Sequence, residues 1–245
     1  MSSPTTPRNA LDGLEWIRRA NDRDIGAGEL REVDMQIADG GRVLRTLRIT
    51  TVRETDGDRS RTLFCLTDPA PLSNINYVLT ERRGDPGSLA VSLHLPYGAG
   101  TFLDLAVTQQ RQGVLGSTFT YEDLRTWLYE RGQECGPAIV DGPAVRVRCR
   151  DGERACEVLL DPGDGFVLGV DHLPAGPAGG APERRYRATE IRTVDGVRVA
   201  GVMTMRRGDR CTTIHLRRAR YGPAFDPRLF ELEWRRNCRQ RLGEW

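Results

Sequence analysis

The fold of this chain is constrained most by one sequence feature. Apolar and polar residues alternate in short segments that recur at regular spacing. Residues 33–37 alternate Val, Met and Ile with Asp and Gln, a glycine turn follows at 39–41, and alternation resumes at 47–49. A period of two places successive side chains on opposite faces of a strand, and a glycine turn joins such strands as a hairpin. Further strand candidates are residues 61–66, 76–80, 89–95, 101–107, 145–149, 156–160, 186–193, 197–205 and 211–218. The sequence therefore predicts an antiparallel sheet of about ten strands.

Three segments instead repeat apolar residues at helical spacing. Residues 10–20 predict a helix with Asn9 as its N-cap, and residues 121–131 predict a helix capped by Thr120. A third helix is expected after Asp226-Pro227, because proline is favoured at the first helical position.

The alternation indicates that one face of the sheet is apolar and the other is exposed to solvent, since Val145, Val147 and Cys149 are interleaved with arginines. The helices should pack on the apolar face. The predicted fold class is α+β: a curved antiparallel half-barrel of about ten strands wrapped around a few amphipathic helices. We expect one domain over residues 10–234, a flexible segment at 1–9 and an Arg-rich C-terminal tail at 235–245.

Composition and charge exclude several classes of function. The chain of 245 residues has a net charge of +2, so bulk electrostatics give no argument for a nucleic-acid partner. All 36 basic residues are arginine, which excludes lysine Schiff-base chemistry. The first residues lack the features of a secretory signal, and no segment has the roughly 18 apolar residues of a membrane span. We expect no integral membrane segment and a cytoplasmic protein, or an extracytoplasmic one if a signal was removed.

Cysteine and histidine patterns do not predict a metal site or a cofactor. The six cysteines contain no CxxC pair, and His94, His172 and His215 lie far apart in the sequence. Cys149 and Cys156 can face each other across a hairpin. They then form a cross-strand disulfide, or stay reduced as small apolar residues if the chain is cytosolic. Both alternatives are open at this level.

The candidate functional residues lie on the predicted strands. Several apolar side chains of these strands either line a hydrophobic ligand cavity or belong to the hydrophobic core. They are Met35, Leu93, Leu95, Leu103, Leu105, Met203 and Met205. Asp104 stands among apolar neighbours, where burial would favour a protonated carboxyl able to act as acid or base; the alternative is a place on the wet face. The arginines near 235–241 either meet an anionic lipid surface or form a solvated helix end.

The segment Ser88-Leu-Ala-Val-Ser-Leu-His-Leu-Pro96, with the later box Gly116-Ser-Thr-Phe-Thr-Tyr-Glu-Asp-Leu124, resembles the outer-membrane lipoprotein-sorting family. Residues 195–203, 211–216 and 227–230 are similar to the closing part of that family. The resemblance implies a LolA/LolB-like fold, in which a half-open antiparallel barrel shields an acyl chain or a similar apolar ligand. The box at 116–124 is expected to shape the entry from strand to helix rather than to contact the ligand.

Two functions follow as hypotheses. The first is a non-catalytic carrier of a hydrophobic small molecule or acyl chain, without a cofactor and with transient contact to a membrane or transporter. The second is an intracellular enzyme of cyclase or isomerase type that folds a bulky hydrophobic intermediate in the same barrel, with Asp104 as its acid.

Overall fold

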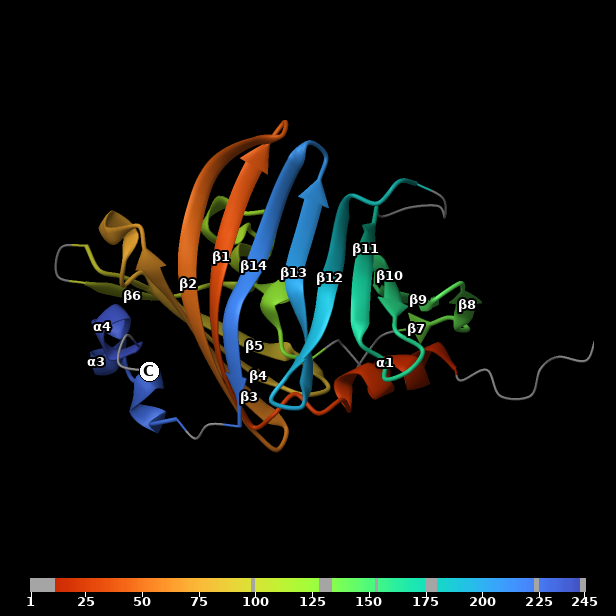
Figure 1. The fold of residues 1–245 in the computed structure, drawn as a ribbon, viewed down its shortest axis with the longest axis horizontal. Helices are drawn as coiled ribbons and strands as arrows, with labels where there is room; N and C mark the ends of the chain where they lie inside the picture. The colour runs from red at the N-terminus through yellow and green to blue at the C-terminus, as the bar shows by residue number, and fades with distance from the viewer. Residues whose placement is uncertain are drawn as a thin grey trace, which may run out of the picture.

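A computed structural model describes residues 12–97, 100–127, 134–152, 154–174, 180–222 and 225–242. Within these residues, fourteen strands form one antiparallel sheet, which is strongly curved so that its two halves face each other across a concave side (Figure 1). The strands are β1 (Gly28–Asp39), β2 (Arg42–Asp56), β3 (Arg59–Asp68), β4 (Asn76–Arg82), β5 (Asp85–Leu95), β6 (Thr101–Asp104), β7 (Glu134–Cys135), β8 (Ile139–Asp141), β9 (Ala144–Asp151), β10 (Arg154–Leu160), β11 (Val167–Leu173), β12 (Arg184–Val194), β13 (Val197–Arg207) and β14 (Arg210–Tyr221).

The sheet runs in the order β6-β5-β4-β3-β2-β1-β14-β13-β12-β11-β10-β9-β7, with β8 paired to β9. Two meanders are therefore joined in the middle, where β1 pairs with β14. The prediction of an antiparallel curved sheet is confirmed, but the expected strand number was too low. β7, β8 and β11 were missed. β7 and β8 are only two and three residues long, so they are too short to show a period of two, and β11 is interrupted by Gly169.

The helical elements are too short for a sheet wrapped around amphipathic helices: among the described residues, α1 has nine residues and every other element has three to five. They are α1 (Gly13–Asn21), η1 (Ala70–Leu72), α2 (Val107–Gln110), η2 (Val114–Gly116), η3 (Glu122–Leu124), η4 (Pro227–Phe230), α3 (Leu232–Arg235) and α4 (Cys238–Leu242). The predicted N-cap Asn9 lies outside the described residues. Asp12 instead precedes α1, and its backbone N–H donates to the Glu15 carboxylate at 2.8 Å.

The predicted helix over 121–131 is wrong within its described part, which ends at 127. Only the single turn η3 forms, and the Asp123 carboxylate begins it by accepting from the Thr120 backbone N–H at 2.7 Å and from its hydroxyl at 2.8 Å. The Thr126 N–H then donates to the Glu81 carboxylate at 2.6 Å, a bond that replaces the helical one. Tertiary hydrogen bonds thus override the local helix signal.

The concave face of the sheet carries a continuous apolar floor. Directly opposed residues share a face, and one row across five strands consists of Ala188, Met203, Ile214, Met35 and Leu47. At the far end of this face α1 packs Trp16 and Ile17 against the buried valines and leucine of β9 and β10. The concave face is therefore the main core of the protein.

The convex face is not wet throughout, contrary to the sequence-based expectation. Over β1–β4 it carries a second apolar cluster with the C-terminal segment, whose buried members are Leu30, Val52, Leu63, Cys65, Val78, Phe225, Leu229, Cys238 and Leu242. A disulfide between Cys65 of β3 and Cys238 of α4 joins the two layers. Over β9 the expected alternation is confirmed, because Val145 and Val147 are buried and Arg148 is exposed.

The structure shows neither a Cys149–Cys156 disulfide nor a reduced Cys149, because the edge strand β7 supplies another partner for Cys149. Cys149 stands opposite both Cys135 and Cys156, and its disulfide is with Cys135. A residue in an inner antiparallel strand directs its backbone N–H and C=O toward only one of the two adjacent strands. With the opposed residue of the other adjacent strand it forms a non-hydrogen-bonded pair, in which the two Cα atoms are closer. The Cα separation of 4.1 Å identifies Cys135 as that close partner.

Candidate functional site

Most of the predicted lining residues meet on the concave floor. Met35 and Met205 are buried in its central cluster, and Met203, Leu93 and Leu95 are half-buried and pack against the same cluster. These five side chains come from β1, β5 and β13, which are far apart in sequence. Curvature of the sheet is what brings them together.

The remaining sequence-predicted residues lie near the edge strand β6. Leu105 and Leu93 both pack against a neighbouring apolar cluster that contains Tyr77 and Tyr121, which we call the Tyr77 cluster. Leu103 is 43% exposed. Asp104 is exposed and stands opposite Ser92 on the convex side, whose next neighbour Val78 belongs to the convex cluster. The burial that an interior acid requires is therefore lacking at Asp104, and its catalytic role stays a prediction.

A loop covers the concave floor, and we call it the crossing loop (residues 113–120). Figure 1 shows this green segment between the two halves of the curved sheet. Its ends pair as an isolated bridge between Gly113 and Thr120. A Cβ atom at Gly113 would stand 2.2 Å from the carbonyl oxygen of Ser117, so only glycine permits this tight return.

Two apolar side chains of the crossing loop point into the floor. Phe119 is buried in the central cluster, with its ring edge-on to Tyr186 at 6.2 Å, and Leu115 packs against both the central cluster and the Tyr77 cluster. The box that carried the family resemblance thus contacts the concave floor directly. Its expected role in a strand-to-helix entry was wrong, because the box ends in the single turn η3 and residues 121–127 form no α-helix. Phe119 and Leu115 were missed because loop residues have no periodicity that marks them as buried.

Few hydrogen bonds hold the crossing loop on the sheet. The backbone N–H of Thr118 donates to the Thr212 hydroxyl at 3.0 Å, and the Thr118 hydroxyl donates to the carbonyl oxygen of Met205 at 2.8 Å. Arg210 donates to the Gly116 carbonyl oxygen at 2.9 Å. Leu115 adopts a φ of 54°, a left-handed conformation that non-glycine residues rarely adopt. The loop is a strained cover with a small number of anchors.

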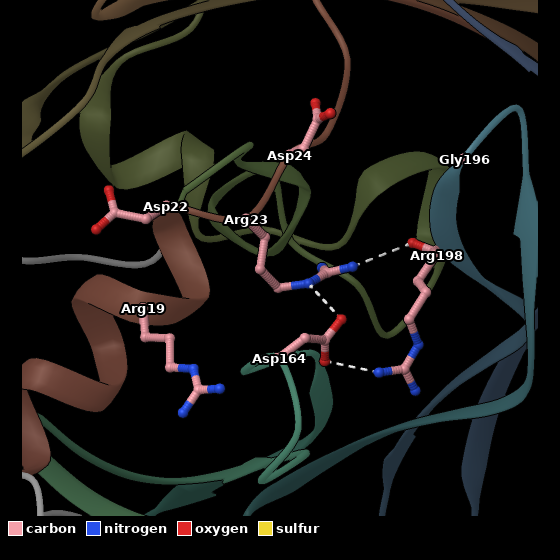
Figure 2. A pocket seen from close by; sticks show the side chains of 7 residues that line it. All are labelled: Arg19, Asp22, Arg23, Asp24, Asp164, Gly196 and Arg198. Carbon is pink, nitrogen blue, oxygen red and sulfur yellow. Dashed lines mark hydrogen bonds and ion pairs between the residues drawn. The ribbon is translucent and has the colours of Figure 1, made fainter.

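A charged pocket of about 390 Å³ lies at the C-terminal end of α1 and is drawn in Figure 2. Asp164 bridges Arg23 at 3.2 Å and Arg198 at 2.6 Å, and Arg198 also pairs with Asp161. Burial opposes the charge of Asp164, but the Phe166 backbone N–H and both arginines hold its pKa below the usual range. Asp164 thus links the Arg23 guanidinium, just after α1, to the Arg198 guanidinium of β13, so this pocket fixes the end of α1 to the sheet.

The histidines do not gather into one site. His94 is buried on the convex side, where its Nδ1 lies 3.1 Å from the Asn76 amide nitrogen and its ring stacks on Phe102. His172 lies 3.5 Å from Asp123, and burial together with Arg184 lowers its pKa. They serve local packing and the attachment of the covering segments.

Arg235 is not part of a solvated helix end. It is 2% exposed and donates to the Asn76 side-chain oxygen at 2.9 Å and to the Ser92 carbonyl oxygen at 2.7 Å. Burial lowers the pKa of Arg235 to about 10, so the guanidinium stays charged at neutral pH. This residue fastens the C-terminal segment to β4 and β5.

Comparison of the sequence with protein-family models and with curated proteins gives no match. Several solved structures share the fold over most of the chain. A DUF1329 family protein from Desulfovibrio piger has 16% identity and a TM-score of 0.79, with 90% of this chain and 96% of that chain covered. A putative outer membrane lipoprotein-sorting protein domain from Vibrio parahaemolyticus has 16% identity and a TM-score of 0.79, with 92% and 98% covered.

A LolA superfamily protein from Nitrosomonas europaea has 9% identity and a TM-score of 0.66, with 92% of this chain and all of that chain (100%) covered. Identities this low establish the architecture alone. The chain therefore has the fold of LolA superfamily and outer-membrane lipoprotein-sorting proteins, which confirms at the level of the fold the resemblance carried by residues 116–124.

Proposed function

We propose that this protein is a non-catalytic carrier that holds an acyl chain or similar apolar ligand on its concave floor. The observation that carries the proposal is the crossing loop, which places Phe119 and Leu115 on a floor containing Met35, Met203 and Met205. Flexible methionine side chains adapt to ligands of variable shape. In this proposal the ligand takes the place of the two loop side chains.

Displacement of the loop has a favourable energetic balance for a long chain. Each buried CH₂ group contributes about 0.8 kcal/mol, whereas displacing the loop costs about 1 kcal/mol for each of its few hydrogen bonds and about 1.5–3 kcal/mol for each of the buried Phe119 and Leu115 side chains. A chain longer than about ten carbons is therefore needed for a net gain. Short apolar molecules gain less and should bind weakly. The carrier should therefore prefer ligands with long hydrocarbon chains.

We further infer an extracytoplasmic location in place of the cytoplasmic expectation. The Cys65–Cys238 and Cys135–Cys149 disulfides support it, because disulfides persist in oxidising compartments. The neighbour described as an outer membrane lipoprotein-sorting domain agrees with it. Among the described residues, no helix has the length and apolarity needed to cross a membrane. Loading and release would then take place by transient contact with a membrane or a transporter.

Uptake of the neutral fluorescent probe N-phenyl-1-naphthylamine tests the carrier. The wild-type protein should enhance its fluorescence with a saturable dependence on probe concentration, and Met203→Arg should reduce its affinity about ten-fold or more by placing a charge on the apolar floor. Thr204→Arg is the matched control, since Thr204 is the next residue of β13 and points to the opposite face. Absence of uptake by the wild type, or equal loss in both variants, would refute the carrier.

The Thr118→Val variant tests the crossing loop as a cover. It removes the hydroxyl that donates to Met205 and keeps the shape of the side chain, so the loop should open more readily. We expect probe uptake in stopped-flow mixing to be about five-fold faster, corresponding to about 1 kcal/mol for one hydrogen bond. Thr118→Ser retains the hydroxyl and should behave as wild type. Identical rates in all three proteins would show that the loop stays in place during uptake.

A further inference from the structure

A polar cluster interrupts the apolar floor at the end where β1, β2 and β14 meet, and we call it the arginine end (Glu29, Arg31, Arg53 and Tyr221). Arg31 pairs with the Glu29 carboxylate at 2.8 Å, and Arg53 pairs with the same carboxylate at 2.8 Å. Arg31 also donates to the Tyr221 hydroxyl at 2.7 Å and 3.0 Å. Tyr221 belongs to the central apolar cluster, so the arginine end borders the floor.

Sheet register places these residues on the concave side. Arg31 stands opposite Thr51, and the same row continues through Phe64, Tyr77 and Leu93. Leu93 is one of the floor residues, and opposed residues of neighbouring strands share a face. An arginine at this place is therefore part of the concave surface and not of the outer one.

The arginine end holds more positive than negative charge. Two guanidinium groups share the single carboxylate of Glu29, and Arg53 and Glu29 are only 6% and 5% exposed. Burial opposes the charge of Arg31, but Glu29 and Tyr221 hold its pKa above the usual value. Arg53 and Glu29 balance each other, so the surplus positive charge lies on the partly exposed Arg31, where an anion can pair with it.

Several donors of the arginine end have no acceptor. Arg53 Nε is buried without a hydrogen-bond partner. Within the described part of the chain, the Nη1 group of Arg31 also makes no hydrogen bond, although Nε and Nη2 are both used. The Arg31 side chain is 29% exposed and lies in the electrostatic reach of Tyr186, the residue that packs on Phe119 of the crossing loop. Arg31 is therefore the partly exposed guanidinium of the arginine end.

We propose that the arginine end binds the anionic oxygen headgroup of a single-chain amphiphile whose hydrocarbon tail lies on the methionine floor. This inference rests on the proposed carrier function and names its ligand class. A headgroup oxygen accepts from Arg31 Nη1, and the added negative charge balances the second guanidinium beside Glu29. Charge-assisted hydrogen bonds of this kind are stronger than neutral ones, so the site prefers acids to neutral lipids of equal chain length.

Competition against bound N-phenyl-1-naphthylamine at pH 8 tests the headgroup separately from the tail. The competitors are oleate, oleyl alcohol and 1-oleoyl-lysophosphatidate, and inorganic phosphate without a chain is the fourth arm. Oleate should compete at a concentration at least about ten-fold lower than oleyl alcohol. Relative strength of oleate and lysophosphatidate distinguishes a carboxylate from a phosphate headgroup, and inorganic phosphate should not compete.

Variants at Arg31 make the test specific. Arg31→Met should abolish the preference for oleate while probe binding and oleyl alcohol competition persist, and Arg31→Lys should keep part of the preference. Arg48→Met is the matched control: Arg48 lies on β2 of the same sheet, pairs with Asp34 at 3.0 Å, and should keep the full preference. Equal competition by oleate and oleyl alcohol in the wild type, or an unchanged preference in Arg31→Met, would overturn the headgroup site and leave the carrier standing. Absence of probe binding by the wild type would refute the carrier itself.

Discussion

Loss of the Cys65–Cys238 disulfide is expected to lower the free energy of unfolding by about 5 kcal/mol. The two cysteines are 173 residues apart, so their bond closes a loop over most of the chain and restricts the unfolded state strongly. Both sulfurs also lie within the convex apolar cluster, which the C-terminal segment shares with β3. The measurement is urea unfolding of Cys65→Ala/Cys238→Ala beside the wild type under non-reducing conditions.

The second disulfide provides the internal control for this effect. Cys135 and Cys149 are only 14 residues apart, and Cys135→Ala/Cys149→Ala should cost about 3 kcal/mol. The difference between the two double variants isolates the length of the closed loop. Equal losses in both would contradict the entropic explanation, and no loss in the first would show that residues 238–242 do not stabilise the sheet.

Arg235→Met is expected to lower the free energy of unfolding by about 2–4 kcal/mol. Removal of the guanidinium leaves the Asn76 side-chain oxygen and the Ser92 carbonyl oxygen without this donor inside the protein. Each unsatisfied buried acceptor costs about 1–3 kcal/mol, and relief of the buried charge offsets part of that cost. The unfolding midpoint in urea should fall, with an unchanged dependence on denaturant concentration.

Arg239→Met is the matched control for the Arg235 variant. Its side chain is exposed one turn further along the same segment, and its hydrogen bond to Asn74 uses the backbone N–H, which the substitution keeps. A change within about 0.5 kcal/mol is expected. Similar destabilisation by both substitutions would show that helical propensity, and not the Asn76 and Ser92 contacts, accounts for the loss.

The location of the floor was predictable from sequence, and its cover was not. Met35, Met203 and Met205 stand at alternate strand positions, and a period of two assigns them to one face wherever the strands pair. Phe119 and Leu115 belong to a loop whose burial depends on Thr212 and Met205, almost a hundred residues later. Local patterns contain no information about such a partner.

Most strands of the two meanders, their antiparallel pairing and the apolar floor were determined by the sequence alone, because alternation and turn residues act between neighbours in the chain. The fate of residues 121–127 was decided by the tertiary structure, since Glu81 takes the Thr126 N–H that a helix would use. The tertiary structure also decided the pairing of Cys149, which depends on which neighbouring strand presents its close, non-hydrogen-bonded position. The arginine end likewise exists only once β1, β2 and β14 are side by side, because its charges interact through space and not along the chain.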